Sequence, residues 1–160
     1  MKVFIILLFA SLFFTQCTTQ HIYVTRHAEK GTSSNAPSDP PLSTEGTQRA
    51  QALKEALKGK KIQQIYATPT QRAMLTAQPL SEALQVKIQT YGPAPDKTLL
   101  EQLKSQKKNT LIIGHSNTVD DIVNSLTKKP TLKDLSDQSY GDLFIITYRG
   151  KKVKLQETKF

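Results

Sequence analysis

Arginine and histidine are scarce in this chain, with four and three copies against eighteen lysines, and both types follow predicted strands. Arg26 and His27 follow the apolar run Ile22–Val24, with only Thr25 in between. Arg72 and His115 occupy comparable positions after two later strand-like runs. An arginine presents planar N–H donors that suit phosphate oxygens, and a neutral imidazole can attack phosphorus. The pattern therefore predicts one site that binds an anion, with phosphate as the leading candidate.

The surroundings of each residue indicate what it can contribute to such a site. Arg72 lies in the first turn of a predicted helix, where a cation opposes the helix dipole unless both face an anion. His27 stands among positive charges, which should lower its pKa and keep the ring neutral and nucleophilic. His115 follows Gly114, which permits close backbone approach, and can donate to phosphoryl oxygens in a transition state. The ordinary alternatives are a local carboxylate partner for each arginine and a structural role for each histidine, the role we assign to His21.

Strands and helices must alternate along the chain to bring these residues together. Hydrophobic periodicity predicts strands at His21–Thr25, Ile62–Ala67, Val86–Tyr91 and Thr110–Gly114, and a final hairpin from Leu143–Tyr148 and Lys152–Thr158. Helices are predicted at Ser43–Leu57, from Pro69 onward with Thr68 as its cap, at Asp96–Lys104, and at Asn117–Leu126 with Asn117 as its cap. This order predicts an α/β domain with a mostly parallel sheet, helices on both faces and a C-terminal antiparallel hairpin. Ligands of such sheets bind beyond the carboxyl ends of the strands, where all four site residues lie.

Two further features concern the pocket itself. The proline- and serine-rich stretch Gly31–Pro41 predicts a loop beside the site that can form part of the pocket wall. Metal binding is the competing use of histidine, but His27 and His115 have no H-x-x-x-H spacing and no cysteine partner. Clustered arginines would also repel a cation. No metal is therefore assigned.

Four segments together resemble the histidine phosphatase superfamily, the phosphoglycerate mutase-like group. In the family's order, they are Tyr23–Lys30, Pro41–Gly46, Ile65–Ala73 and Leu111–Asn117. The resemblance implies a three-layer α/β/α fold, with His27 as the phosphorylated nucleophile and Arg26 and Arg72 as phosphate-binding residues. His115 would complete the pocket as a second catalytic residue, and neither a metal nor a cofactor is implied. Ala28 stands where most members carry glycine, which suits the short, compact branch of the superfamily.

The proton donor is the part of the family pattern that the sequence matches least well. Many members place an acid between the positions matched by Arg72 and His115. Asp96 is the best-placed carboxylate in that interval, and Glu29, two residues after the predicted nucleophile, is the competing candidate. Without an acid, only good leaving groups such as aryl phosphates or phosphoamides would react well. Short loops also leave little room for a cap that excludes water, which favours a phosphatase over a mutase.

These observations predict a metal-independent phosphatase that hydrolyses phosphomonoesters or phosphoamides through phosphorylated His27. Its partner would be a phosphorylated small molecule or a phosphoprotein. A catalytically idle, phosphate-ligand-binding envelope protein of the same fold is the alternative. A third reading is a basic surface protein that binds anionic lipid or nucleic acid through its lysine pairs.

The N-terminal residues predict an exported protein. Met1–Lys2 is basic and Val3–Phe14 is apolar, but twelve residues are too few to span a bilayer, which needs about twenty. Residues 1–16 are therefore predicted to be a signal peptide, followed by a single domain over residues 20–160. Cys17 is the only cysteine, and its position predicts a lipoprotein, periplasmic or membrane-anchored, with Cys17 as the first mature residue. Because Gln16 stands where a small residue is usual, a simple cleaved signal is the alternative.

The formal net charge is +9, and lysine supplies the excess. Much of it occurs in pairs, at Lys60-Lys61, Lys107-Lys108, Lys128-Lys129 and Lys151-Lys152. Such pairs usually form solvated faces, although they also attract anionic ligands or an anionic membrane surface. No basic helix with interleaved aromatic residues and no arginine cluster is present, so nucleic acid binding is not predicted.

Overall fold

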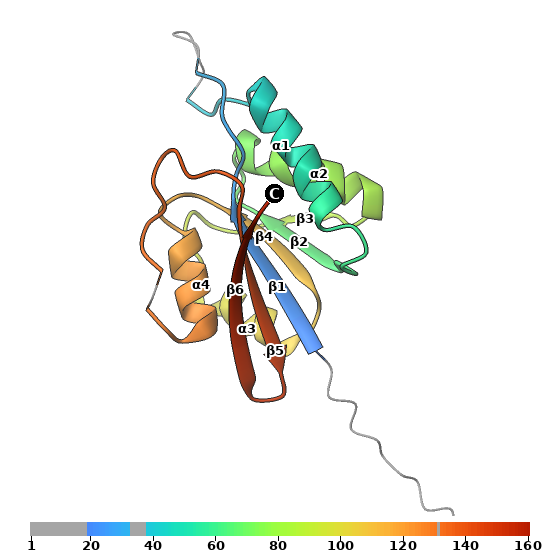
Figure 1. Cartoon of the computed structure of the whole chain (residues 1–160), viewed down its shortest axis with the longest axis vertical. Coiled ribbons are helices and arrows are strands. Elements are labelled where there is room, and N and C mark those ends of the chain that lie inside the picture. Colours follow the sequence, from blue (N-terminus) through green and yellow to red (C-terminus); the bar gives the residue numbers. More distant parts are fainter. Residues whose placement is uncertain (1–18, 33–37, 131) are drawn as a thin grey trace, which may run out of the picture.

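A computed structural model describes residues 19–32, 38–130 and 132–160, and it shows one six-stranded sheet with helices on both sides (Figure 1). The predicted signal peptide and Cys17 lie outside these described residues. None of the helices in the described ranges is long and apolar enough to cross a bilayer. The elements in chain order are β1 (Thr19–Arg26), α1 (Thr44–Ala56), β2 (Gln64–Ala67), α2 (Gln71–Leu84), β3 (Ile88–Thr90), α3 (Lys97–Ser105), β4 (Thr110–Gly114), α4 (Val119–Thr127), β5 (Asp142–Arg149) and β6 (Lys152–Lys159).

The strand order is β3-β2-β4-β1-β5-β6, and the first four strands in this order are parallel. β5 runs antiparallel to β1, and β6 runs antiparallel to β5, as the predicted hairpin requires. The mixed α/β fold with a mostly parallel sheet is therefore confirmed. β4 and β1 lie at the centre of the sheet, so the two strands that carry His115 and His27 are also among the best-buried segments.

Side chains that alternate along the strands divide the core into two layers. On one face, Tyr23 and Leu111 pack with Leu53 of α1 and with α2. On the other face, Val24 and Ile112 pack with α3 and α4. The sheet is thus covered on both sides, which gives the three layers implied by the family resemblance. It also places the strand ends, rather than a strand face, in contact with solvent.

Gly46 allows α1 to pack closely against the segment that follows the predicted nucleophile. The backbone N–H of Ser43 donates to the carbonyl of Glu29 at 2.9 Å, and the Ser43 hydroxyl caps α1 by accepting from the Gly46 N–H at 3.1 Å. A Cβ at Gly46 would clash with the backbone of Glu29, so only glycine allows this approach. The segment after β1 is therefore held by direct backbone contact with α1.

Two predicted helix starts are wrong, and both corrections arise at the site. α2 begins at Gln71 instead of Pro69, because the Thr68 hydroxyl contacts His115 and does not cap the helix. α4 begins at Val119, so Asn117 is not its cap. Thr68, which the local pattern assigns to a helix cap, is used instead for a contact across the strand ends.

Candidate active site

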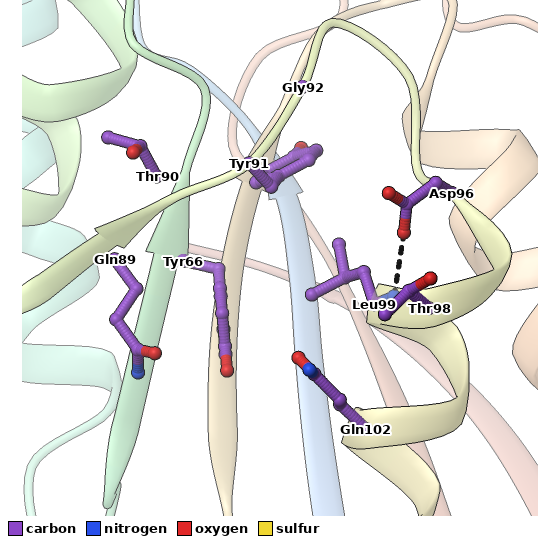
Figure 2. Close-up of a pocket in the computed structure, with 9 residues that line it drawn as sticks. All are labelled: Tyr66, Gln89, Thr90, Tyr91, Gly92, Asp96, Thr98, Leu99 and Gln102. Atoms are coloured by element: carbon purple, nitrogen blue, oxygen red, sulfur yellow. Dashed lines mark hydrogen bonds between the residues drawn. The ribbon is translucent and has the colours of Figure 1, made fainter.

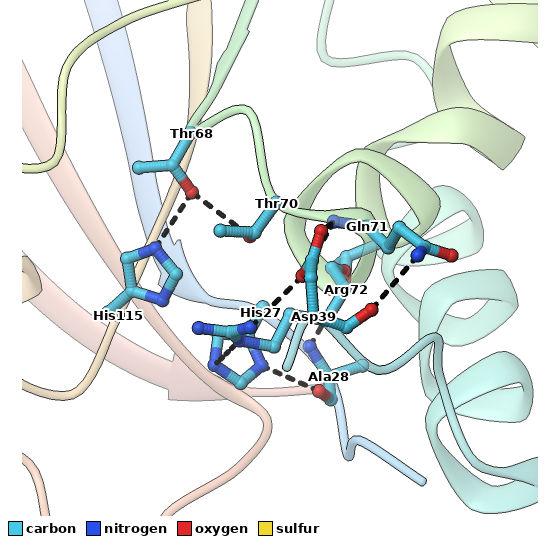
Figure 3. A network of polar contacts seen from close by, with 9 residues as sticks. His27, Ala28, Asp39, Thr68, Thr70, Gln71, Arg72 and His115 are labelled. Carbon is cyan, nitrogen blue, oxygen red and sulfur yellow. Dashed lines mark hydrogen bonds and ion pairs between the residues drawn. The ribbon is translucent and has the colours of Figure 1, made fainter. Parts of the chain in front are cut away.

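The carboxyl ends of β1, β2 and β4 meet at one edge of the sheet and surround a cavity of about 420 Å³. The four residues predicted to form the site all line this cavity, and they come from segments up to about 90 residues apart. Figure 3 shows three of them, His27, Arg72 and His115, with their polar contacts. The remaining lining residues are Lys30, Thr70, Pro93, Ser116, Asn117 and Asp137.

His27 is held by the backbone on both sides and is only 4% exposed. Its backbone N–H donates to the carbonyl of Gly114 at 2.9 Å, and this bond connects the end of β1 to the end of β4. Its Nδ1 lies 2.8 Å from the carbonyl oxygen of Ala28. Because a carbonyl can only accept, Nδ1 carries the proton and Nε2 keeps its lone pair. The Arg72 Nε–H donates to that Nε2 at 3.1 Å.

The pKa of His27 is lowered to about 3. Burial is the main cause, and it outweighs the hydrogen bond to Ala28, which raises the pKa. His115, Arg26 and Arg72 then lower it further. The direction agrees with the expectation from the sequence, although burial contributes more than the positive charge that the sequence suggested. The ring is neutral at physiological pH.

Arg72 lies between His27 and Asp39, a residue that the sequence analysis did not single out. Its Nη1 is 3.3 Å from Oδ1 of Asp39. The same carboxylate accepts the backbone N–H of Gln71 at 2.9 and 3.1 Å, so Asp39 caps α2 from the loop predicted to form the pocket wall (Figure 3). The only available signal was the position of Asp39 in that loop, just before Pro40.

His115 faces His27 edge-on, with 5.2 Å between ring centroids. Its Nε2 lies 2.8 Å from the hydroxyl of Thr68, a contact absent from the sequence analysis. The pKa of His115 is lowered to about 4, mainly by burial and then by the charges of Arg72 and Arg26, which outweigh the opposite effect of Asp39. Both imidazoles are therefore neutral, and they present nitrogen atoms rather than charges.

Arg26 is 7% exposed and is held by the loop that precedes β5. Its Nη1 donates to the carbonyls of Ser136 and Ser139 at 3.0 and 3.3 Å. The guanidinium lies 4.3 Å from the ring centroid of Tyr140, and Nη2 is 3.8 Å from Asp137. Its Nε is buried without a hydrogen-bond partner among the described residues. The group thus retains an unused donor, as an anion-binding residue would.

Neither predicted proton donor lines the cavity. Asp96 caps α3 by accepting the N–H of Leu99 at 2.7 Å, and it lines a separate pocket beside Tyr66 and Tyr91 (Figure 2). Glu29 receives hydrogen bonds of 2.6 to 2.9 Å from Arg49. Burial is the largest single influence and raises the pKa of Glu29, but the hydrogen bonds from Arg49, a backbone hydrogen bond and the charges of Arg49 and Arg26 together outweigh it, so the pKa is lowered. A carboxylate held in this way is a poor proton donor.

The comparisons with known proteins agree with this geometry. The family model described as "Histidine phosphatase superfamily (branch 1)" matches residues 22–92. The resemblance to that superfamily is confirmed. No curated protein matches the chain in sequence.

Solved structures share the histidine phosphatase fold over nearly their whole length. The protein histidine phosphatase SixA complexed with tungstate is 18% identical, with a TM-score of 0.66 and coverage of 87% of this chain and 96% of its own. A mycobacterial glucosyl-3-phosphoglycerate phosphatase is 11% identical, with a TM-score of 0.68 and coverage of 89% and 98%. Phosphoserine phosphatase from Entamoeba histolytica is 16% identical, with a TM-score of 0.68 and coverage of 88% and 97%. At these identities the likeness establishes the fold, and together with the family match it supports a phosphatase.

Proposed function

We propose that the protein is a metal-independent phosphatase that hydrolyses phosphomonoesters or phosphoamides through a phosphohistidine intermediate on His27. The main support is the hydrogen bonding of the His27 ring. Donation from Nδ1 to Ala28 leaves the Nε2 lone pair directed at Arg72, the residue proposed to hold the phosphoryl group. A neutral, oriented imidazole beside two arginines is the arrangement that nucleophilic attack on phosphorus requires.

The proposed reaction has two steps. His27 Nε2 attacks phosphorus as the bond to the leaving oxygen or nitrogen breaks, and the leaving group takes that electron pair. Water then attacks the phosphorus of phosphohistidine, which releases inorganic phosphate and restores the neutral ring. Arg72 exchanges its contact with Nε2 for the phosphoryl oxygens, while Arg26 and His115 donate to the charge that develops there.

The choice of leaving group follows from the acids around the cavity. Glu29 and Asp96 are both engaged elsewhere, so the proposed enzyme favours substrates that depart without protonation by an aspartic or glutamic acid. Aryl phosphates and phosphoamides meet this condition. The similarity in fold to a protein histidine phosphatase makes a phosphoamide of a protein side chain the first natural substrate to test.

A rapid-quench experiment tests the mechanism directly. The protein is mixed with a radiolabelled aryl phosphate in the presence of a chelator, and an acid-labile phosphohistidine is expected to form before inorganic phosphate accumulates. His27→Ala should form none, while His21→Ala, which alters a histidine outside the cavity, should behave as wild type. Turnover by His27→Ala at the wild-type rate would exclude the mechanism. Binding of vanadate with no turnover of any phosphoester would instead identify the idle phosphate-binding protein.

We also propose that the protein is exported and carries a lipid on Cys17. The proposal rests on the sequence of residues 1–17 alone. Mass spectrometry of the protein from its own membranes should find a diacylglycerol-modified Cys17 at the N-terminus. An intact Met1 in that sample would contradict both parts, and an unmodified N-terminus near residue 17 would indicate a simple cleaved signal.

A further inference from the structure

The parallel strands begin at the edge opposite the cavity, and the segments at that edge are strongly basic. Five segments meet there, at residues 57–63, 85–87, 106–109, 128–130 and 149–152. They contain half of the 22 lysines and arginines of the chain and none of its 13 acids. We call this surface the basic pole, and its cations are Lys58, Lys60, Lys61, Lys87, Lys107, Lys108, Lys128, Lys129, Arg149, Lys151 and Lys152.

Contacts between the elements place four of these segments side by side. The Gln63 N–H donates to the carbonyl of Asn109 at 2.8 Å, which joins residues 57–63 to residues 106–109. Thr19 pairs with Arg149, so the turn between β5 and β6 lies beside the start of β1. The Tyr148 hydroxyl donates to the carbonyl of Leu126 at 2.7 Å, which brings the end of α4 to that turn. Lys104 Nζ donates to the carbonyl of Ser125 at 3.2 Å, which joins the ends of α3 and α4. In Figure 1 the turn and the start of β1 lie at the lower end of the molecule, away from the loops around the cavity.

The cations of the basic pole are exposed and almost unpaired. All eleven side chains belong to exposed residues. Within the described parts of the chain, only Lys58 takes part in an ion pair, at 3.8 Å from Glu55. Neighbouring like charges without counterions repel one another, an arrangement that costs energy even where a lysine at a helix C-terminus complements the helix dipole. It favours a partner that supplies the missing negative charge.

The basic pole also carries the exposed apolar side chains of the molecule. Among the described residues, the large hydrophobic side chains that are exposed are Leu84 at 39% and Val153 at 40%. Leu84 ends α2 just before residues 85–87, and Val153 directly follows Lys152 of the turn. Apolar side chains surrounded by lysines are typical of surfaces that enter the interface of a lipid bilayer.

Backbone conformation is a further feature of the lysines at the pole. The non-glycine residues with left-handed backbone angles, among those described, all lie in its segments. They are Lys61, Gln85, Lys107 and Lys128, with φ between 50° and 57°. Glycine adopts this conformation at lower cost than any residue with a Cβ. Three of the four positions carry lysine, so positive charge occupies positions that the backbone alone would give to glycine.

We propose that the basic pole is a docking surface for an anionic lipid bilayer. Lysines near such a surface are attracted by its negative potential, and Leu84 and Val153 would enter the headgroup region. β1 starts at Thr19, two residues after the predicted lipid site at Cys17, so a tether there would hold the same pole against the bilayer. The cavity at the opposite edge would then face the solvent. This inference does not depend on the proposed phosphatase activity.

Lysine footprinting on vesicles tests the orientation with the full chain. The protein is labelled with an amine-reactive reagent on vesicles of phosphatidylcholine alone and on vesicles that also contain phosphatidylglycerol. We expect the pole lysines to be protected on the anionic vesicles, and Lys97 and Lys133, which lie outside the pole, to remain reactive. Residues 1–18 are the same in both samples, so their contribution cancels. Equal labelling of the pole lysines on both kinds of vesicle would overturn the proposal.

Matched charge reversals distinguish the effect of charge at the basic pole from the effect of the net charge of the whole protein. Lys107→Glu with Lys129→Glu removes four units of charge at the pole, and Lys97→Glu with Lys133→Glu removes four elsewhere. The first pair should weaken flotation with anionic vesicles by about tenfold or more, and the second by about twofold at most, because salt screens distant charges. Unchanged thermal midpoints show that both pairs are folded. Equal losses from both pairs would show that only net charge matters and would reject the docking surface.

The double variant Leu84→Ser with Val153→Ser tests whether the partner of the pole is a lipid bilayer or a nucleic acid. These substitutions should weaken binding to anionic vesicles by about threefold or more, because apolar area leaves the lipid interface. Binding to a DNA or RNA duplex should be weaker than binding to vesicles at the same salt concentration. Tighter binding to the duplex, with vesicle binding unaffected by the two serine substitutions, would identify the pole as a nucleic acid surface and overturn the lipid proposal.

Discussion

The two edges of the sheet use positive charge in opposite ways. At the carboxyl edge, Arg26 and Arg72 are partly or fully buried, and their N–H groups are directed by carbonyls, a carboxylate and an imidazole. At the opposite edge, eleven cations are exposed and only Lys58 is ion-paired among the described residues. The hydrogen bonds at the carboxyl edge hold individual arginine nitrogen atoms in defined positions. The exposed lysines at the opposite edge only create a high local density of positive charge.

This difference determines how each edge should respond to change. Loss of one positioned group at the cavity leaves other buried polar atoms without partners, so single substitutions there should have large effects. At the basic pole each lysine contributes a small amount to the free energy of binding an anionic partner, and salt screens that contribution. Single substitutions there should therefore weaken binding only slightly, and their effects should add. Salt should weaken the functions of the pole much more than the chemistry of the cavity. Substitutions at the cavity should therefore have the largest effects on function, and single substitutions at the pole the smallest.

The largest effect is expected at the proposed nucleophile. His27→Ala should lower kcat for an aryl phosphate by about 10⁴-fold or more, because no other group in the cavity is placed to form the covalent intermediate. Steady-state turnover measures this loss. His21→Ala, at the start of β1, should leave kcat within about twofold of wild type, since its Nδ1 contacts only Thr147. A comparable loss in both variants would remove the distinction between the cavity histidine and a structural one.

Arg72→Lys should lower kcat/KM by about 10² to 10³-fold, although it preserves the charge. Lysine cannot reproduce the planar fork that contacts both His27 and Asp39. Arg149→Lys provides the matched control at the basic pole, and it should change neither turnover nor vesicle binding by more than about twofold. If Arg72→Lys retained full activity, the cavity would depend on charge density alone, as the pole does.

Much of this architecture could be predicted from local sequence patterns. The strand Thr110–Gly114 is found with the predicted bounds, because a continuous apolar run of that length suits a strand covered on both faces. Arg26, His27, Arg72 and His115 were identified because each follows a strand that ends at the same edge. These are properties of short segments, and alternating strands and helices leave few ways to assemble them.

Contacts between distant loops could not be predicted in this way. The carbonyl of Ser136 that accepts from Arg26 lies 110 positions further along the chain, and nothing in its sequence surroundings marks it. Asp39 was similarly missed, because its role depends on how its loop meets the start of α2. The lysine pairs were recognised, but their convergence on one pole depends on the topology, which places the ends of the four helices and the β5–β6 turn at the same edge.

Asp39→Asn is expected to raise KM by about tenfold with a smaller change in kcat. The carboxylate anchors Arg72, and its loss removes the negative charge from that contact, whereas the asparagine oxygen can still accept the N–H at the start of α2, so the free energy of unfolding should change little. Asp96→Asn is the matched control, because Asp96 caps α3 but does not line the cavity. It should likewise change stability little, and it should leave KM unchanged. If Asp96→Asn instead reduced kcat for poor leaving groups only, Asp96 would be the proton donor after all.

Acid should destabilise the protein through the two cavity histidines. Their folded-state pKa values, about 3 and about 4, lie below the ordinary value of 6.5, so the unfolded chain binds more protons between these limits. The stability that they contribute is complete above pH 6.5 and is lost as the pH falls toward 3. Thermal midpoints of wild type and of His27→Asn with His115→Asn should therefore converge on acidification. A profile parallel to that of wild type in the double variant would contradict the assignment.

The smallest effect should have opposite signs for folding and for docking. Lys107→Gly relieves a left-handed backbone position and should raise the free energy of unfolding by about 0.5 to 1 kcal/mol, measured by urea denaturation. The same change should weaken binding to anionic vesicles by a few-fold, since one of eleven cations is lost. Lys107→Asn provides a second variant, because asparagine also tolerates this conformation without carrying charge. If both variants were more stable and bound vesicles as tightly as wild type, the lysine at this position would not serve docking. A gain in stability joined to a loss in binding is the result expected of a position where the surface function opposes the preference of the fold.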